Sequence, residues 1–212
     1  MTTTLVLASA SPARREVLRS AGIDPVVRIS DVDEDAVAAA LPADTTPQTV
    51  VVELARAKAV AVAAVVPDYA ADCVVVGCDS MLLVDGVLQG KPHTPEVARA
   101  RWAEMAGRSA DLITGHCVLR LIDGEIVAES VDCSSTTVHF AKPEPDELDA
   151  YIATGEPLQV AGAFTLDGLG GWFVDRIEGD PSSVIGIGLP LLRRLLGDVG
   201  VAVAQLWRHT DR

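Results

Sequence analysis

The chain has 212 residues, of which 49% are hydrophobic and 22% are charged, as is typical of a soluble globular protein. Its 30 acidic and 17 basic residues give a formal net charge of −13. This charge argues against binding of a nucleic-acid backbone, which relies on lysine and arginine displacing counterions. A small polyanionic ligand would need basic residues gathered locally, or a metal ion that bridges the gap.

The sequence contains no segment that predicts export or membrane insertion. Its start lacks the basic n-region of a signal peptide, and its longest apolar stretch, Ala59–Val66, stops at Pro67 and is too short to span a bilayer. The cysteines show no Cys-x-x-Cys pair and no histidine at ligand spacing. We therefore expect a cytoplasmic protein with four reduced thiols, Cys73, Cys78, Cys117 and Cys133.

In the first half of the chain, two helix starts are marked by a cap residue followed by proline. Ser11-Pro12 begins one helix, which Gly22 ends, and Thr46-Pro47 begins a longer helix that reaches Val65. Compact apolar runs predict buried strands. The other expected elements are the strand Leu5–Ala8, an extended segment Asp24–Val32, a helical piece from Val32–Glu34 to near Pro42, and the strand Cys73–Val76.

In the second half, the turns Asp85-Gly86 and Asp123-Gly124 each predict a β-hairpin, because this residue pair suits a tight two-residue turn. The expected hairpin strands are Met81–Val84, Val87–Gln89, Asp111–Ile122 and Glu125–Phe140. The remaining expected elements are helices from Thr94 to Gly107, over Glu144–Thr154 and over Leu189–Leu196, a strand Trp172–Ile177 and a final apolar element Val201–Trp207.

This alternation of helices and strands, with two hairpins, predicts an α/β fold in which helices flank a mixed central sheet. No internal repeat, low-complexity tract or linker divides the sequence, so residues 1–212 are expected to form a single domain. The segment Ser9-Ala10-Ser11-Pro12 after the first strand lacks the glycines of a G-x-G-x-x-G motif. This argues against a dinucleotide-binding Rossmann fold.

The strand-to-helix segment Ala8–Arg15 is a candidate phosphate site. Backbone N–H groups at a helix N-terminus suit an anion, and Ser9 and Ser11 add hydroxyl donors. Arg14 and Arg15 add charge in the first turn, where the helix dipole disfavours arginine, so both need another reason to be there. The alternative is a capped surface helix whose arginines pair with carboxylates.

Asp79 comes soon after the predicted strand Cys73–Val76 and is preceded by Gly77-Cys78, at an edge where α/β proteins collect their ligands. A carboxylate at this position could act as a general base or hold a divalent cation. The alternative is a turn aspartate that accepts hydrogen bonds from nearby backbone N–H groups. The local sequence leaves both interpretations open.

Two lysines and an acidic run complete the candidates. Lys91, held between glycine and proline, either directs a point charge at a phosphate or lies solvated in a loop. Lys58, on a helix otherwise nearly all small and apolar, either reaches water or meets an anion. The run Asp31–Asp35, which includes Glu34, is either a solvated face or a set of oxygen ligands for a hard metal.

Taken together, the candidates fit a metal-dependent phosphoanhydride site. The histidines, His93, His116, His139 and His209, are scattered and are assigned no role.

Read in order, these segments resemble the Maf family of nucleotide pyrophosphatases. The matching segments cover nearly the whole chain in collinear order, so chance is a poor explanation. They are Leu7-Ala8-Ser9-Ala10-Ser11-Pro12, Asp33-Glu34, Leu54-Ala55 with Lys58-Ala59, Gly77-Cys78-Asp79-Ser80, Gly90-Lys91-Pro92, Gly107-Arg108, Thr114-Gly115, Gly155-Glu156-Pro157, Ala161-Gly162-Ala163-Phe164 and Gly188-Leu189-Pro190-Leu191.

The resemblance implies two lobes separated by a cleft, a fold related to inosine triphosphate pyrophosphatase, and usually a homodimer. It also implies that water attacks the α-phosphorus of a nucleoside triphosphate, giving the monophosphate and pyrophosphate, with removal of non-standard nucleotides as one use. Asp79 would accept the proton from water and, with Glu34, hold Mg²⁺ or Mn²⁺. The residues that would neutralise the triphosphate are Ser9, Ser11, Arg14, Arg15, Lys58 and Lys91.

Some positions depart from the family pattern. Ala13 stands where the first of two arginines usually follows the serine-proline pair, so one anion contact is either lost or supplied by Arg15. Gln159, Val160 and Asp167 replace the Asp-Lys and the glutamine of the thymidine/uridine triphosphate branch, so no base preference is implied. These departures keep open a non-catalytic nucleotide-binding regulator of cell division. A phosphatase that releases orthophosphate is a third hypothesis.

Overall fold

The computed structural model describes residues 3–65 and 71–207. Its strands are β1 (Thr4–Ala8), β2 (Val26–Arg28), β3 (Asp72–Val84), β4 (Val87–Gln89), β5 (Ser109–Ile122), β6 (Glu125–Phe140) and β7 (Val174–Glu178). Its α-helices are α1 (Pro12–Ser20), α2 (Glu34–Ala39), α3 (Pro47–Ala63), α4 (Pro95–Met105), α5 (Pro145–Ala153), α6 (Pro181–Ile185) and α7 (Leu189–Asp198). Short 3₁₀ helices are η1 (Glu156–Gln159), η2 (Ala161–Ala163), η3 (Leu169–Phe173) and η4 (Val203–Gln205).

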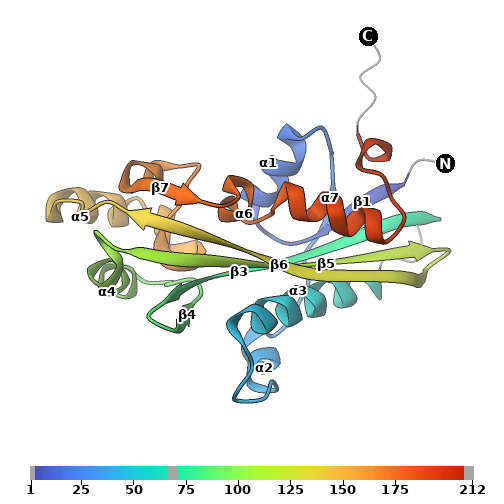
Figure 1. The fold of residues 1–212 in the computed structure, drawn as a ribbon, viewed down its shortest axis with the longest axis horizontal. Helices are drawn as coiled ribbons and strands as arrows, with labels where there is room; N and C mark the ends of the chain where they lie inside the picture. The colour runs from blue at the N-terminus through green and yellow to red at the C-terminus, as the bar shows by residue number, and fades with distance from the viewer. Residues whose placement is uncertain (1–2, 66–70, 208–212) are drawn as a thin grey trace, which may run out of the picture. The chain divides into compact units, whose positions relative to one another are not determined.

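The strands form one seven-stranded sheet in the order β2-β1-β3-β5-β6-β7, with β4 paired to β3 (Figure 1). β1 is parallel to β2 and β3, whereas β3–β4 and β6–β7 are antiparallel pairs. Both Asp-Gly turns have positive φ at each residue, as a two-residue hairpin turn requires. The predicted α/β class with a mixed sheet flanked by helices is therefore confirmed.

The chain forms two compact units that share the long strands β3, β5 and β6. The first unit comprises residues 1–79, 114–133 and 186–212, and the second comprises residues 80–113 and 134–185. The single domain expected for residues 1–212 and the cleft between two lobes stay predictions. Within the described residues, no helix has both the length and the apolar content needed to cross a bilayer.

The first unit has helices on both faces of its strands. Successive side chains of a strand point to opposite faces, and here the side chains on both faces are apolar and need cover. Leu5 and Leu7 of β1 pack into an aliphatic core with α1 and α7. Val6 and Ala8 pack on the opposite face, in a second core with α3. Figure 1 shows α3 and α7 on opposite sides of the strands.

Two glycines let α3 lie unusually close to this sheet. A Cβ atom on Gly77 of β3 would lie 2.1 Å from the carbonyl oxygen of Ala55, and one on Gly115 of β5 would lie 2.3 Å from that of Val51. Both are closer than real Cβ contacts come, so glycine is required at these two positions by the helix–sheet distance. Because α3 lies this close to the sheet, a long side chain of the helix can reach residues of β3.

The second unit is built around aromatic side chains. Trp102 of α4 is completely buried, and its indole N–H donates a hydrogen bond of 2.8 Å to the carbonyl oxygen of Ala163. Its ring makes edge contacts with three other aromatic rings, those of Phe140, Tyr151 and Phe173. These contacts join α4, α5, β6 and η3 into one core.

Several predicted boundaries are wrong. β3 runs unbroken over Asp72–Val84, so Cys73–Val76 and Met81–Val84 are parts of one strand. Gly77, which directly follows the first predicted segment, lies inside this strand, and its missing side chain allows the close contact with α3. Only Val26–Arg28 of the extended segment Asp24–Val32 is a strand. Two further segments are shorter or different in type: Trp172 and Phe173 lie in η3, and η4 covers only Val203–Gln205.

Candidate functional site

Asp79 lies inside β3 and is buried, with an exposed fraction of 6%. The expected position beyond the end of a strand is therefore wrong, because β3 continues to Val84. The alternative of a turn aspartate is wrong for the same reason. Its carboxylate instead meets a cation: Lys58 Nζ lies 2.5 Å from Asp79 Oδ1.

Lys58 projects from α3 and is itself 8% exposed. Besides Asp79, its ammonium group contacts Glu34 Oε1 at 2.8 Å. Of the two predictions for this lysine, contact with an anion is the one that the structure shows. Because Gly77 brings α3 close to β3, the lysine reaches the carboxylate of Asp79 two residues further along that strand.

Burial raises the pKa of Asp79 above the ordinary value of an aspartate. The positive charges of Lys58 and Arg14 act in the opposite direction, and the negative charge of Glu34 adds to the rise. A buried carboxylate with a raised pKa is a stronger base than an exposed one. The environment of Asp79 therefore favours acceptance of a proton more than an exposed position would.

Glu34 begins α2, directly after the N-cap residue Asp33. The Asp33 carboxylate accepts the backbone N–H of Ala36 at 2.9 Å, and acidic residues in the first turn of a helix are favoured by its dipole. Part of the acidic run thus serves to start the helix. The side chain of Glu34 is half exposed and points its Oε1 at Lys58.

Arg14 links three segments of the first unit. Its Nη1 donates to Ser9 Oγ at 3.0 Å and to the carbonyl oxygen of Cys78 at 2.8 Å, and its Nε donates to the carbonyl oxygen of Gly186 at 2.8 Å. Ser11 is the N-cap of α1 and accepts the backbone N–H of Arg14 at 3.3 Å. These bonds to oxygen acceptors offset the unfavourable position of an arginine at a helix N-terminus.

The first unit thus brings together six of the predicted site residues on neighbouring elements. Asp79, Lys58 and Glu34 form one contiguous ion cluster, and Arg14 contacts the residue before Asp79. The six are Ser9, Ser11, Arg14, Glu34, Lys58 and Asp79.

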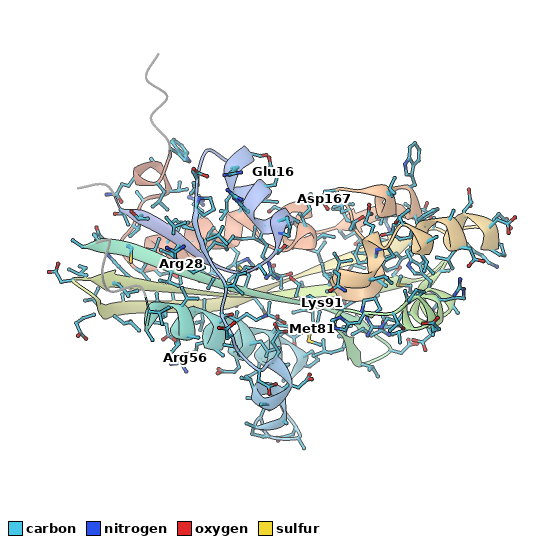
Figure 2. All side chains as sticks on the ribbon, turned by 180° about the vertical axis from the view of Figure 1, so that it is seen from behind. Glu16, Arg28, Arg56, Met81, Lys91 and Asp167 are labelled. Atoms are coloured by element: carbon cyan, nitrogen blue, oxygen red, sulfur yellow. The ribbon has the colours of Figure 1, made fainter. Side chains whose placement is uncertain are left out.

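Arg15 and Lys91 are both exposed. Arg15 lies in the first turn of α1, and Lys91 lies in the second unit after β4 (Figure 2). The carbonyl oxygen of Gly90 accepts hydrogen bonds from Arg101 Nη1 at 2.5 Å and from the N–H of Gly162 at 3.2 Å. These bonds hold the segment that carries Lys91. The phosphate contacts expected of Arg15 and Lys91 stay predictions.

The carboxylates of Glu34 and Asp79 converge on one positive group, the ammonium of Lys58. Two carboxylates that approach a common centre fit Mg²⁺ or Mn²⁺, which prefer oxygen ligands and take the rest from water and substrate phosphates. Among residues 3–65 and 71–207, no group of three or more His, Cys, Asp or Glu side chains gathers as a metal site.

The family model for Maf-like proteins matches residues 4–199. The chain belongs to the Maf family. A protein of Nocardia farcinica is 86% identical over 212 residues, which is the whole length of both proteins. A protein of Rhodococcus jostii is 69% identical over 211 residues, 99% of each chain, and one of Mycolicibacterium vanbaalenii is 58% identical over 208 residues, 98% of this chain and all of that one. Each of the three is named a nucleoside triphosphate pyrophosphatase.

Membership of the Maf family confirms the resemblance predicted from the motifs. The four cysteines are free thiols, as expected, and three of them are buried: Cys73, Cys78 and Cys117. The motifs reach the loop before α7 at Gly188 but did not indicate Gly186, which accepts a hydrogen bond from Arg14. They also gave no role to His116, which is fully buried in the first unit.

Proposed function

We propose that this Maf-family chain hydrolyses nucleoside triphosphates to the nucleoside monophosphate and pyrophosphate, with Asp79 as the proton acceptor. The observation that carries the proposal is the buried Asp79 carboxylate beside Lys58, in a chain whose Nocardia farcinica relative is named a nucleoside triphosphate pyrophosphatase. The activity predicted from the sequence agrees with those names.

In the proposed reaction, the oxygen of a water molecule forms a bond to the α-phosphorus as the bond to the pyrophosphate oxygen breaks. The proton of the water passes to Asp79, whose raised pKa makes it a stronger base than an exposed aspartate. Lys58, released from part of its contact with Asp79 once that carboxylate is neutral, can then attract the negative charge of the phosphate oxygens. Ser9, Ser11 and Arg14 would bind the remaining phosphate oxygens.

A divalent cation, Mg²⁺ or Mn²⁺, would be held by Glu34 and Asp79 and would neutralise charge on the triphosphate. The convergence of the two carboxylates on the Lys58 ammonium supports this assignment. Chelation followed by addition of each metal in turn tests it. Unchanged turnover after complete removal of divalent cations would contradict it.

The proposed activity is tested by incubating the protein with canonical, methylated and deaminated nucleoside triphosphates and resolving the products. Monophosphate and pyrophosphate are expected. Orthophosphate would indicate a phosphatase instead. Nucleotide binding without turnover under every metal condition would favour a non-catalytic regulator of cell division.

Asp79→Asn keeps the shape of the side chain but removes the base, so turnover should fall at least about 100-fold. Asp72→Asn is a matched control, because Asp72 lies on the same strand and accepts a hydrogen bond of 3.0 Å from Thr3, away from the ion cluster. The control should keep its turnover. An active Asp79→Asn variant would show that another group accepts the proton.

We further propose a cytoplasmic homodimer that does not bind nucleic acid or membranes. The net charge of −13 supports the absence of nucleic-acid binding, and the family resemblance supports the dimer. Sedimentation at several protein concentrations measures the oligomeric state. A monomer at micromolar concentration would contradict the proposed dimer.

A further inference from the structure

His116 of β5 is a buried, titratable side chain that the proposed reaction does not use. It lies in the first unit with an exposed fraction of 0%. Its Nδ1 lies 3.1 Å from the carbonyl oxygen of Thr114, and its Nε2 lies 2.9 Å from the backbone nitrogen of Gly188. A backbone N–H only donates and a carbonyl only accepts, so Nε2 is the acceptor and the proton is on Nδ1. These two bonds assign a neutral ring in one tautomer.

The hydrogen bond from Gly188 anchors the short loop that precedes α7. Gly188 is the N-cap of this helix, and Ile187 beside it is completely buried in the aliphatic core. Gly186 has a φ of +127°, which only glycine adopts readily. A buried N–H that lost its acceptor would be costly, so the imidazole ring holds this loop against the core.

The other end of the loop carries Arg14. The carbonyl oxygen of Gly186 accepts Arg14 Nε at 2.8 Å, and a Cβ atom on Gly186 would lie only 3.1 Å from the same nitrogen. Arg14 Nη1 reaches on to Ser9 Oγ and to the carbonyl oxygen of Cys78, the residue before Asp79. A continuous set of contacts therefore runs from the histidine ring to the ion cluster.

We propose that His116 is a positioning residue: its neutral ring fixes the loop Gly186–Gly188, and the loop sets Arg14 against Ser9 and the backbone before Asp79. The proposal rests on the proposed function, because it assumes that Arg14 and Asp79 serve hydrolysis. The ring itself makes and breaks no bond. A shift of the loop would displace Arg14, and small displacements of catalytic groups lower rates strongly.

The test compares three variants in the full chain. His116→Leu removes the acceptor, and we expect kcat to fall about tenfold or more with a smaller change in KM. His116→Gln keeps an acceptor for the Gly188 N–H and should recover most of that loss. Val118→Ala, on the same strand face and in the same core, controls for general destabilisation and should keep kcat within about twofold. Equal losses in His116→Leu and Val118→Ala would overturn the proposal, as would a Gln variant as impaired as the Leu variant.

Two measurements do not depend on turnover. A long-range ¹H–¹⁵N NMR spectrum of the wild-type protein should show His116 protonated at Nδ1 alone at neutral pH, and any other form would overturn the proposal. A double-mutant cycle on unfolding, with His116→Leu and Arg14→Gln, should be non-additive because both residues hold one loop. Additive effects would overturn it. Absence of nucleotide turnover in the wild type, by contrast, would contradict the proposed function. The NMR spectrum and the double-mutant cycle would still decide whether His116 holds the loop and Arg14.

Discussion

Asp79 in the first unit and Glu156 in the second are both carboxylates with specific partners, yet their pKa values shift in opposite directions. Burial acts to raise both. For Asp79 burial prevails over the attraction of Lys58 and Arg14, and the pKa is raised. For Glu156 the hydrogen bonds that the carboxylate accepts prevail, and the pKa is lowered.

The difference lies in the kind of partner. Glu156 accepts hydrogen bonds from the hydroxyl of Thr165 and from the backbone N–H groups of Leu169 at 3.2 Å and Gly170 at 3.0 Å. These donors stabilise the ionised form and tie down the loop that contains η3. Asp79 is more deeply buried, so its ionised form loses more of the stabilisation that water gives to a charge. One carboxylate therefore stabilises a loop, whereas the other is prepared to take up a proton.

Among variants that test this difference between the two carboxylates, Lys58→Met should cause the largest loss of folding stability. Because the pKa of Asp79 is raised in the folded protein, ionising this group costs stability as the pH rises, and Lys58 limits that cost. Losing one partner of a buried ion pair costs about 3–5 kcal/mol. Urea unfolding should show a larger loss at about pH 8 than at about pH 5. A loss that grew toward acid pH would contradict the raised pKa.

Glu156→Gln should have a smaller effect with the opposite pH dependence. The lowered pKa of Glu156 means that its stabilisation is present above the pKa of the unfolded chain and disappears as the pH falls through the folded value. We expect a loss of about 1 kcal/mol near neutral pH, since solvent screens this half-buried group. Thermal unfolding over a pH series measures it. A loss that persisted in acid would mean that shape, not charge, holds the loop.

Trp172→Ala should have the smallest effect. Trp172 follows the glycines of η3, and 84% of its surface is exposed, unlike the buried Trp102. An exposed side chain contributes little to folding, so the free energy of unfolding should change by at most about 0.5 kcal/mol. Chemical denaturation gives the value. A change above about 2 kcal/mol would show that the second unit relies on this ring as well as on its buried core.

Local signals in the sequence predicted most elements, because caps and turns act over a few residues. Ser11, Thr46 and Thr94 cap the three helices that they were expected to cap, and both Asp-Gly pairs form hairpin turns. The predictions were wrong where the role of a residue is set by a contact with a residue distant in the sequence. Gly77 resembles the end of a strand, and its purpose becomes visible only with Ala55 of α3 packed against it.

The candidate site was predicted in part for the same reason. Lys58 stood out because it interrupts an apolar helix, and Glu34 because it lies in an acidic run. Their meeting with Asp79 depends on tertiary packing, which no local pattern encodes. His116 gave no signal at all, because a single histidine in a strand looks the same whether it is a core residue or an anchor for a loop 72 residues away.

The first unit is assembled from three separated stretches of chain, and its aliphatic core joins Leu5 and Leu7 near the start to Leu192 and Leu206 near the end. A nascent chain therefore cannot complete this core until Leu192 and Leu206 have left the ribosome. The second unit, which ends at residue 185, has all its residues earlier. Contacts across so long a stretch of sequence form slowly. We therefore expect the half of the molecule that holds Asp79 to complete its core after the other half during synthesis.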